Sequence, residues 1–232
     1  MAEIEYVGGE LELFAQATNW KGYFTSFLAP HIQGDVLEVG AGIGANTRTF
    51  LEASADQVSS WTLVEPDKNL LDVAKSDLDG ESVGFAVGTI QDLDGRYDTL
   101  IYIDVLEHIR DSRLELELAH AMLNRGGKVI ILVPAFQMLY NEFDASIGHY
   151  RRYTKKRLME DYRSLFDPIE LAFFDSLGFG ASVANKLILH KPIPSASNVR
   201  FWDKILVPLS RVTDRLVFRS FGKSLVAVLA KK

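Results

Sequence analysis

The 232-residue sequence contains no cysteine, so neither disulfide bonds nor thiolate metal sites can form. It also lacks any stretch of about 18 uncharged apolar residues, the length that a transmembrane helix needs. The first twelve residues carry acids and no apolar run, which argues against an N-terminal signal peptide. No internal repeat or low-complexity stretch is present. These absences lead us to expect a cytoplasmic protein.

Charge is distributed unevenly along the chain. The net charge is −6, but residues 185–232 hold ten Lys or Arg and two acids. That segment therefore carries +8 and the remainder of the chain −14. A basic end on an acidic body predicts an anionic partner for that end, with a solvated basic face as the alternative. The acidic body, which has no long basic stripe, argues against nucleic acid as a partner.

Apolar runs and amphipathic segments alternate along the chain, which predicts an α/β protein with a doubly wound sheet. The runs that we expect to be strands are 35–39, 60–65, 82–87, 97–103, 128–133, 168–174 and 224–229. The segments that we expect to be helices are 10–31, 44–54, one opened by Pro66, 111–123 and 154–165. Residues 135–153 are expected to form a long loop or a broken helix. The pattern predicts one domain over 1–232 with a mostly parallel seven-stranded sheet.

About fifty residues separate the last two expected strands, which is too long for a hairpin. Helical patterns near 179–190 and 200–218 predict a helical lid insertion at about 178–221. Long connections in compact domains are usually functional.

Three glycines at alternate positions follow the first expected strand. Gly40, Gly42 and Gly44 come after Glu38 and precede an expected helix, and Glu65 ends the next strand 27 residues after Glu38. Glycines let the backbone turn sharply and approach a ligand. The start of the following helix suits a carboxylate. An acid at the end of the second strand can accept two ribose hydroxyls. This motif alone fits either a nicotinamide dinucleotide or another nucleoside cofactor.

Further motifs occur in order over about residues 30–135. Together they resemble class I S-adenosylmethionine-dependent methyltransferases. The matching segments are Val36–Gly44, Val64–Asp67 with Leu71, Ala74 and Lys75, then Tyr97–Asp98, Val105–Ile109 and Leu123–Gly127. The resemblance implies a Rossmann-like methyltransferase fold and S-adenosylmethionine as cofactor. It also implies that the glycine loop holds the methionine end, Glu65 the ribose, and the segment from Thr89 to Asp92 the adenine.

The resemblance thus implies a set of cofactor-binding residues, which we take to be Glu38, Gly40, Gly42, Gly44, Glu65, Asp92 and Asp104. The family often has Asp where this chain has Thr89, so Asp92 becomes the expected adenine contact.

The segments after the fourth and the fifth expected strands supply candidate catalytic residues. His108 and His149 could each act as a base toward an acceptor hydroxyl. The spacing of Asp104, Glu107 and His108 also resembles an arrangement that binds a divalent ion in some methyltransferases, with His149 as a possible further ligand. We expect no metal, and the metal site stays as the alternative.

The loop over 140–153 combines aromatic and basic residues where the topology places the active site. Arginine forks bind phosphate or carboxylate through two hydrogen bonds. Its Gly-His-Tyr-Arg-Arg-Tyr run resembles a motif of bacterial methyltransferases associated with surface-glycan or lipid-linked sugar pathways. The residues expected to bind the substrate are Tyr140, His149, Tyr150, Arg151, Arg152 and Tyr153.

These motifs predict a methyltransferase acting on a small or lipid-linked acceptor that is anionic, with phosphate or carboxylate, or a sugar. The basic amphipathic pattern over 199–220 predicts peripheral membrane contact, at the inner face, with a packed lid helix as the alternative. Two other functions remain open. One is an NAD(P)-dependent oxidoreductase, although no Tyr-x-x-x-Lys set stands in the expected place. The other is a non-catalytic module that binds S-adenosylmethionine.

Overall fold

The structure is a computed structural model that describes residues 10–189 and 195–232. Seven strands form its centre: β1 (Gly34–Val39), β2 (Val58–Glu65), β3 (Val83–Val87), β4 (Tyr97–Ile103), β5 (Leu123–Pro134), β6 (Phe166–Phe174) and β7 (Ser224–Lys231). The helices up to β6 are α1 (Glu10–Ala15), α2 (Thr18–Leu28), α3 (Thr47–Ser54), α4 (Lys68–Asp77), α5 (Ser112–Met122), α6 (Glu142–Ser146) and α7 (Lys155–Tyr162). Those between β6 and β7 are α8 (Ser176–Ala184), α9 (Ala196–Phe201) and α10 (Val207–Leu216).

The strands form one sheet in the order β3-β2-β1-β4-β5-β7-β6. All run parallel except β7, which pairs antiparallel with β5 and β6. The sheet was expected to be mostly parallel and doubly wound with seven strands, and this prediction is confirmed. The strand order reverses between β1 and β4, and ligands in such sheets bind at the carboxyl ends of the strands at that point.

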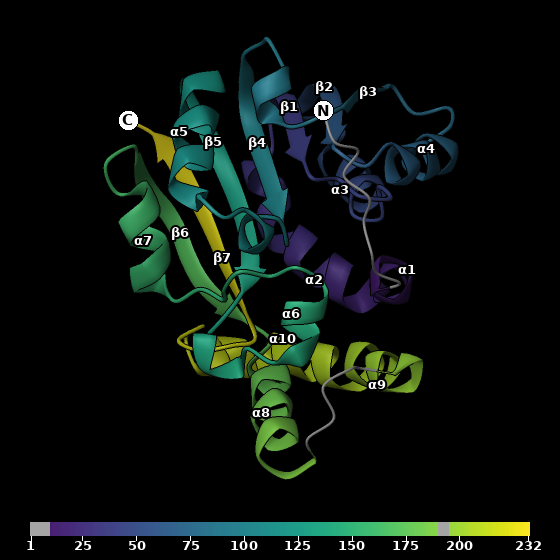
Figure 1. Cartoon of the computed structure of the whole chain (residues 1–232), viewed down its shortest axis with the longest axis vertical. Helices are drawn as coiled ribbons and strands as arrows, with labels where there is room; N and C mark the ends of the chain where they lie inside the picture. Colours follow the sequence, from purple (N-terminus) through teal and green to yellow (C-terminus); the bar gives the residue numbers. More distant parts are fainter. Residues whose placement is uncertain (1–9, 190–194) are drawn as a thin grey trace.

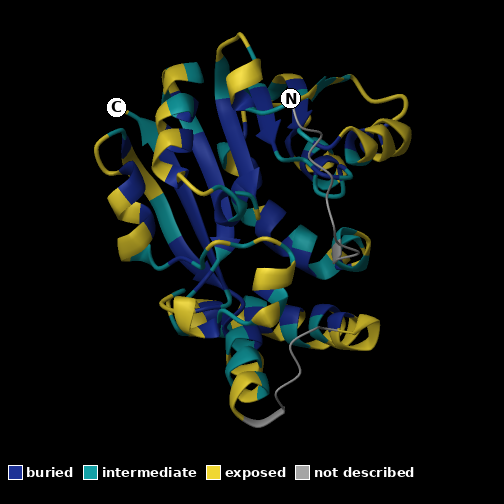
Figure 2. Ribbon diagram, in the orientation of Figure 1, coloured by how far each residue is buried: buried dark blue, intermediate teal, exposed yellow. Residues whose placement is uncertain are grey.

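Two apolar layers cover the sheet (Figures 1 and 2). On one face, side chains of α2, α3 and α4 pack against the strands around Phe24, Phe50 and Leu71. On the other face, α5 and α7 pack around Leu116 and Tyr162. The central strands are buried on both faces, which explains why they read as continuous apolar runs rather than alternating patterns.

Several boundaries differ from the sequence expectations. The expected helix 10–31 is two helices, because α1 ends at Ala15 and α2 begins at Thr18. Pro66 does not open a helix. Asp67 caps α4 instead, accepting hydrogen bonds from the Asn69 and Leu70 amides. β5 is longer than expected and begins directly at the end of α5.

The helices between β6 and β7 form the helical insertion, which we define as residues 175–223 apart from 190–194. Both ends of the helical insertion lie at one edge of the sheet, because Ser224 pairs with Pro134 and Phe174, where β5 and β6 end. The insertion therefore lies beyond the carboxyl ends of the parallel strands (Figure 1). The expected helix near 179–190 reaches residue 190, which lies outside the described residues.

α9, a π-helical turn η6 (Trp202–Leu206) and α10 form one continuous helix over 196–216. No helix in the described part of the chain combines the length and apolar character that crossing a membrane requires.

Candidate functional site

The loop after β1 carries three glycines in a backbone conformation that other residues rarely adopt. Gly40, Gly42 and Gly44 have φ angles of +65°, +56° and +71°. A Cβ added to Gly40 would lie 2.8 Å from the Val105 side chain, so another residue there would clash as well as strain the backbone. The shape of this glycine loop therefore depends on glycine itself.

Glu65, at the end of β2, holds the glycine loop from the neighbouring strand. Its Oε2 accepts a hydrogen bond from the Gly42 amide at 2.9 Å, and its Oε1 accepts one from the Asp67 amide at 3.0 Å. Burial raises the pKa of the Glu65 carboxyl, and the two amides partly offset that rise. Each carboxylate oxygen can accept more than one hydrogen bond. Glu65 thus keeps acceptor capacity for ribose hydroxyls while it fixes the loop.

Glu38 lies behind the glycine loop rather than facing outward. It is buried, and its Oε2 accepts hydrogen bonds from the Thr47 hydroxyl at 2.8 Å and the Trp61 indole at 3.1 Å. Burial raises the pKa of its carboxyl to about 7, against the two hydrogen bonds that lower it. In this structure Glu38 joins the start of α3 to β2, so its contribution to the cofactor site is to position the loop.

Asp92 and Asp104 follow β3 and β4 at the same edge. Asp92 is exposed, and its Oδ2 accepts hydrogen bonds from the Thr89 amide at 2.8 Å and hydroxyl at 2.9 Å, which lower its pKa. The Asp104 backbone is left-handed, with φ +54°. Asp104 as a whole residue is exposed, but the protein surrounds its carboxyl group closely. This desolvation raises the pKa of the carboxyl to about 6, and the charges of His149 and Lys223 partly offset the rise.

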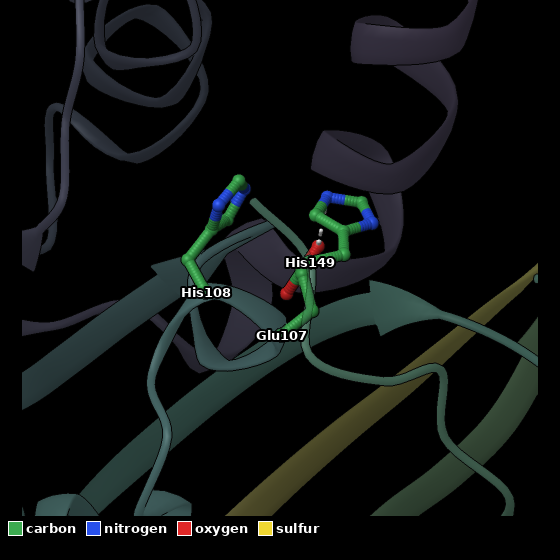
Figure 3. Close-up of side chains that lie close together, drawn as sticks. All are labelled: Glu107, His108 and His149. Atoms are coloured by element: carbon green, nitrogen blue, oxygen red, sulfur yellow. Dashed lines mark ion pairs between the residues drawn. The ribbon is translucent and has the colours of Figure 1, made fainter. Parts of the chain in front are cut away.

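Glu107, His108 and His149 come together beyond β4 (Figure 3). One ligand atom from each lies within 4.8 Å of the others, so the three residues could hold a divalent cation. The His149 Nε2 atom lies 3.9 Å from Glu107 Oε1, and the two imidazole rings meet edge to face with centroids 4.5 Å apart. Burial, with the proximity of His149, lowers the pKa of His108 to about 4, so His108 is neutral at pH 7.

The Glu107 carboxyl has an unusual environment. It is fully buried, and neither of its oxygens has a hydrogen-bond partner within residues 10–189 and 195–232. Burial, and then the nearby Asp104, raise its pKa well above the ordinary value. A carboxyl of this kind is either protonated or paired with a cation, because a bare buried charge is too costly.

Asp144 orients His149. The Asp144 Oδ1 atom lies 2.8 Å from His149 Nδ1, which assigns the proton to Nδ1 and leaves the Nε2 lone pair free toward Glu107. Asp144 itself is buried and receives three hydrogen bonds from the Arg152 guanidinium, at 2.8 to 3.1 Å. The Asn141 amide adds a further one at 3.0 Å. Burial raises the pKa of Asp144, but these hydrogen bonds together bring it below the ordinary value.

The structure places the expected substrate-binding residues of the 140–153 loop in different environments. Arg152 is committed to Asp144, and Arg151 donates to the carbonyls of Ile109 and Arg110 and to the Ser112 hydroxyl. Both guanidinium groups therefore hold the loop in place, and their role toward an acceptor stays a prediction. Tyr153 is buried, with its hydroxyl donating to the Leu106 carbonyl. The expectation that Tyr153 faces an acceptor is therefore wrong in this structure, because its ring fills the core.

The two other tyrosines remain near the candidate acceptor side. Tyr140 donates its hydroxyl to the His149 carbonyl at 2.6 Å, and Tyr150 is 56% exposed. The Tyr150 amide also bonds to the Glu107 carbonyl, which fixes the loop against η3 (Leu106–His108).

Two residues of the site lie outside the sequence expectations. Asp144 was not singled out, although Asn141 and Asp144 form a capping box at the start of α6, and that Asn-x-x-Asp spacing is a readable signal. Lys21 of α2 was also missed. Its ammonium donates to the carbonyls of Ala15 and Ala45, and so ties α1 and the glycine loop together. Nothing in the sequence pattern marks a lysine for that contact.

Comparisons with known proteins agree with this geometry. The chain matches the model of a methyltransferase domain family over residues 16–176. It resembles a chain from the complex between the Haloferax volcanii Trm112 methyltransferase activator and a methyltransferase, at 18% identity, covering 97% of this chain and 98% of that chain, with a TM-score of 0.62. It also resembles the N-methyltransferase NodS from Bradyrhizobium japonicum WM9 in complex with S-adenosyl-L-homocysteine, at 14% identity, 94% and 87% coverage and a TM-score of 0.56.

A third resemblance is to magnesium protoporphyrin IX methyltransferase from Synechocystis PCC 6803 with bound S-adenosyl-L-homocysteine, at 11% identity, 99% and 90% coverage and a TM-score of 0.58. No curated protein matches the chain in sequence.

The fold and the site together define a class I S-adenosylmethionine-dependent methyltransferase. Because the family model spans more than half of the chain, the protein belongs to this methyltransferase domain family. Its cofactor is S-adenosylmethionine. The residues present fit that cofactor, because three left-handed glycines and a buried Glu65 with spare acceptor capacity meet at the carboxyl ends of β1 and β2. The family match decides against the dinucleotide-dependent oxidoreductase.

Proposed function

We propose that the chain transfers a methyl group from S-adenosylmethionine to a hydroxyl of its acceptor, held beside His149. The observation that carries this proposal is the pairing of two built sites at one sheet edge: the glycine loop fixed by Glu65, and His149 oriented by Asp144. When bound, S-adenosylmethionine supplies an electrophilic methyl group, so the protein's main task is alignment.

His149 is the proposed proton acceptor. The Nδ1–H group of His149 donates a hydrogen bond to Asp144, and the Nε2 lone pair points toward Glu107 and His108. A positioned base of this kind contributes on the order of a hundredfold or more in rate. His108, neutral at pH 7, is the second residue that can accept the acceptor's proton.

We place the remaining cofactor contacts on residues of the same edge. Glu65 receives the ribose hydroxyls, the glycine loop surrounds the methionine end, and Asp92 and Asp104 lie at the ends of β3 and β4 to contact the rest of the cofactor. Glu38 supports the loop from behind.

The acceptor class follows from the environment of the loop. An oriented imidazole suits a hydroxyl nucleophile, which favours a sugar, small or lipid-linked, over an acceptor methylated on a phosphate or carboxylate. Because Arg151 and Arg152 are bonded within the protein, we place acceptor recognition on Tyr140, Tyr150 and His149. An anionic group elsewhere on the acceptor remains compatible with this placement.

A divalent cation at Glu107, His108 and His149 is the alternative use of the same cluster, which the two unpaired Glu107 oxygens favour. Titration with Mn²⁺ decides between them. The base proposal expects no saturable binding to the wild type. Saturable binding that Glu107→Gln removes would assign the cluster to a metal.

We also propose that the helical insertion contacts the membrane at its inner face through residues 199–220. Its continuous helix has an unusual orientation, because polar Ser210 and Asp214 are buried while several large apolar residues on the helix or just after it face solvent. Val199 and Val207 of the same helix are buried. Between 48% and 91% of each solvent-facing apolar side chain is exposed: Phe201, Ile205, Leu209, Val212, Leu216 and Phe218. Exposed basic residues Arg200, Lys204 and Arg215 accompany this apolar face, a combination that matches helices lying in the surface of anionic membranes.

A packed lid helix would bury this apolar face, and Leu209, Val212 and Leu216 are exposed. Flotation with vesicles of phosphatidylglycerol and phosphatidylcholine tests the membrane proposal. The wild type should bind and detach as salt rises. The triple variant Leu209→Gln, Val212→Gln, Leu216→Gln should lose binding with an unchanged unfolding temperature. If the wild type does not bind vesicles at low salt, the membrane proposal is wrong and the packed lid helix is the remaining interpretation.

Methyl transfer itself is tested in two steps. Calorimetry with S-adenosylmethionine establishes cofactor binding, and transfer of labelled methyl from the cofactor into lipid and sugar extracts establishes catalysis. Binding without transfer to any extract fraction would support the non-catalytic module instead.

A further inference from the structure

A cavity of about 170 Å³ lies between α2 and α10, apart from the glycine loop and the His149 cluster. Three of its six lining residues are arginines on or just after α10. The lining residues are Tyr23, Ser26, Phe27, Arg211, Arg215 and Arg219. None of them belongs to the cofactor or acceptor site described above.

The three arginines bring positive charge to the cavity. Within the described ranges, none of them forms an ion pair with a carboxylate. The nearest candidate, Asp214, is buried and already accepts hydrogen bonds from the Tyr23 hydroxyl and from the amides of Asp175 and Ser176, at 2.7 to 2.9 Å. Three crowded guanidinium groups repel each other unless an anion lies between them.

Two of the guanidinium groups are held in place before any ligand arrives. Arg219 stacks over the rings of Phe174, Phe27 and Tyr23, with its guanidinium carbon 4.1 Å from the Phe174 centroid, and donates to the Tyr23 hydroxyl at 3.1 Å. Arg211 donates to the Asn19 carbonyl at 3.2 Å. Its Nε atom is buried and has no hydrogen-bond partner among the described residues.

The backbone is also strained to bring Arg219 to the cavity. Phe218 and Arg219 have φ angles of +52° and +50°, a conformation that residues other than glycine rarely adopt, here twice in succession. The turn ends α10, and the Arg219 amide bonds to the carbonyl of Asp214 in the last turn of that helix. Strain of this kind persists only where the surrounding structure enforces it, and it concentrates at binding sites.

We propose that Arg211, Arg215 and Arg219 bind a phosphate group in this cavity. Guanidinium forks match phosphate oxygens through paired hydrogen bonds, and a cavity of this size accommodates one phosphate group with its first linkage. The phosphate comes either from a soluble phosphate compound or from a lipid headgroup, which the exposed apolar face of the same helix would bring close. The proposal does not depend on methyl transfer.

Arg215 provides the sharpest variant, because it is exposed and its guanidinium forms no hydrogen bond or ion pair with the described residues. Arg215→Gln removes one fork and should leave the fold intact. Arg215→Lys keeps the charge and loses the fork. Lys204→Gln is the matched control, since Lys204 is an exposed cation on the same continuous helix and does not line the cavity.

The first arm measures inorganic phosphate and pyrophosphate binding by calorimetry, with chloride at matched ionic strength as reference. We expect saturable binding to the wild type and to Lys204→Gln, and a loss of tenfold or more in Arg215→Gln, with Arg215→Lys in between.

The second arm measures flotation with phosphatidylglycerol vesicles. If the phosphate is a lipid headgroup, Arg215→Gln loses vesicle binding at least tenfold more than Lys204→Gln. If it is soluble, the two variants lose vesicle binding equally while phosphate binding still depends on Arg215.

The proposal is overturned if the wild type shows no saturable phosphate or pyrophosphate binding and both variants lose vesicle binding equally. The arginines would then attract anions only through diffuse positive charge, without a defined binding site. Neither arm measures methyl transfer, so a failure of the proposed enzymatic function and a failure of this site give different results.

Discussion

The cofactor side and the acceptor side of the active edge are held together by different bonds. On the cofactor side, left-handed glycines set the loop, and its amide at Gly42 bonds to Glu65. On the acceptor side, side chains bond to side chains, with Asp144 between His149 and Arg152. One side is therefore fixed by backbone shape and the other by buried charge.

Glu38 on the cofactor side and Asp144 on the acceptor side respond to pH in opposite directions. Burial raises the pKa of Glu38, so its contribution to stability is present at low pH and is lost as pH rises through about 7. Asp144 has a lowered pKa, so its contribution is present at neutral pH and is lost as pH falls. This difference suggests that the acceptor side fails first in acid.

Asp144→Asn should have the largest effect. It leaves the largely buried Arg152 guanidinium unpaired, which costs about 3–5 kcal/mol of unfolding free energy. It also removes the group that orients His149, so turnover should fall a hundredfold or more. Urea unfolding and steady-state kinetics measure both effects, while calorimetry should show unchanged cofactor affinity.

Asp161→Asn serves as the control, because Asp161 is another buried carboxylate. This variant should cost stability without changing the pH profile of the surviving activity. An unaltered turnover in Asp144→Asn would remove the proposed role of the pair.

Gly40→Ala tests whether backbone shape alone sets the cofactor side. The left-handed φ and the contact with Val105 should together cost about 2–5 kcal/mol and abolish measurable cofactor binding. Gly80→Ala is the matched control. Gly80 has φ +86° and no atom within 4 Å of an added Cβ, so only the strain of about 1–2 kcal/mol should appear. Equal losses in the two variants would mean that the close contact is unimportant.

Glu38→Gln should flatten the pH dependence of stability on the cofactor side. The pKa of the Glu38 carboxyl is 4.5 in the unfolded chain and about 7 in the folded protein. As the pH rises from 4 to 8, the unfolding free energy should therefore fall by on the order of 3 kcal/mol. Glutamine does not titrate, so the unfolding free energy of the variant should not fall in this way. Urea unfolding from pH 4 to pH 8 measures the slopes, and parallel slopes for wild type and variant would show that Glu38 does not titrate in this range.

Glu65→Ala should have the smallest of these effects. Charge-assisted hydrogen bonds contribute about 1.5–3 kcal/mol each, so S-adenosylmethionine should bind tenfold more weakly or worse. Calorimetry measures the affinity directly. Equal affinity in the variant would place the ribose elsewhere.

The cofactor side was largely predictable from the sequence, because its signals are local. The expected strand 97–103 coincides with β4, and the glycines stand where β1 ends. The break between α1 and α2 was not predictable, since the apolar spacing continues through it and Ala17, which lies in the break, is buried.

The acceptor side was less predictable, because its contacts depend on which face of a segment turns inward. Arg152 looked like a ligand for an anion, and its partner Asp144 becomes evident only once the loop is folded. The helical insertion shows the same limit. Periodicity predicts an amphipathic helix, but Asp214 lies inside because Tyr23 and two backbone amides bond to it, while Leu216 faces outward.

Transfer of labelled methyl from S-adenosylmethionine into lipid and sugar extracts, by the wild type and by His149→Gln, tests the central claim most directly. The account predicts labelled product with the wild type and at least a hundredfold slower transfer with His149→Gln, whose affinity for S-adenosylmethionine stays at the wild-type value. Transfer by His149→Gln at the wild-type rate, or a wild type that binds the cofactor and labels nothing, would contradict it.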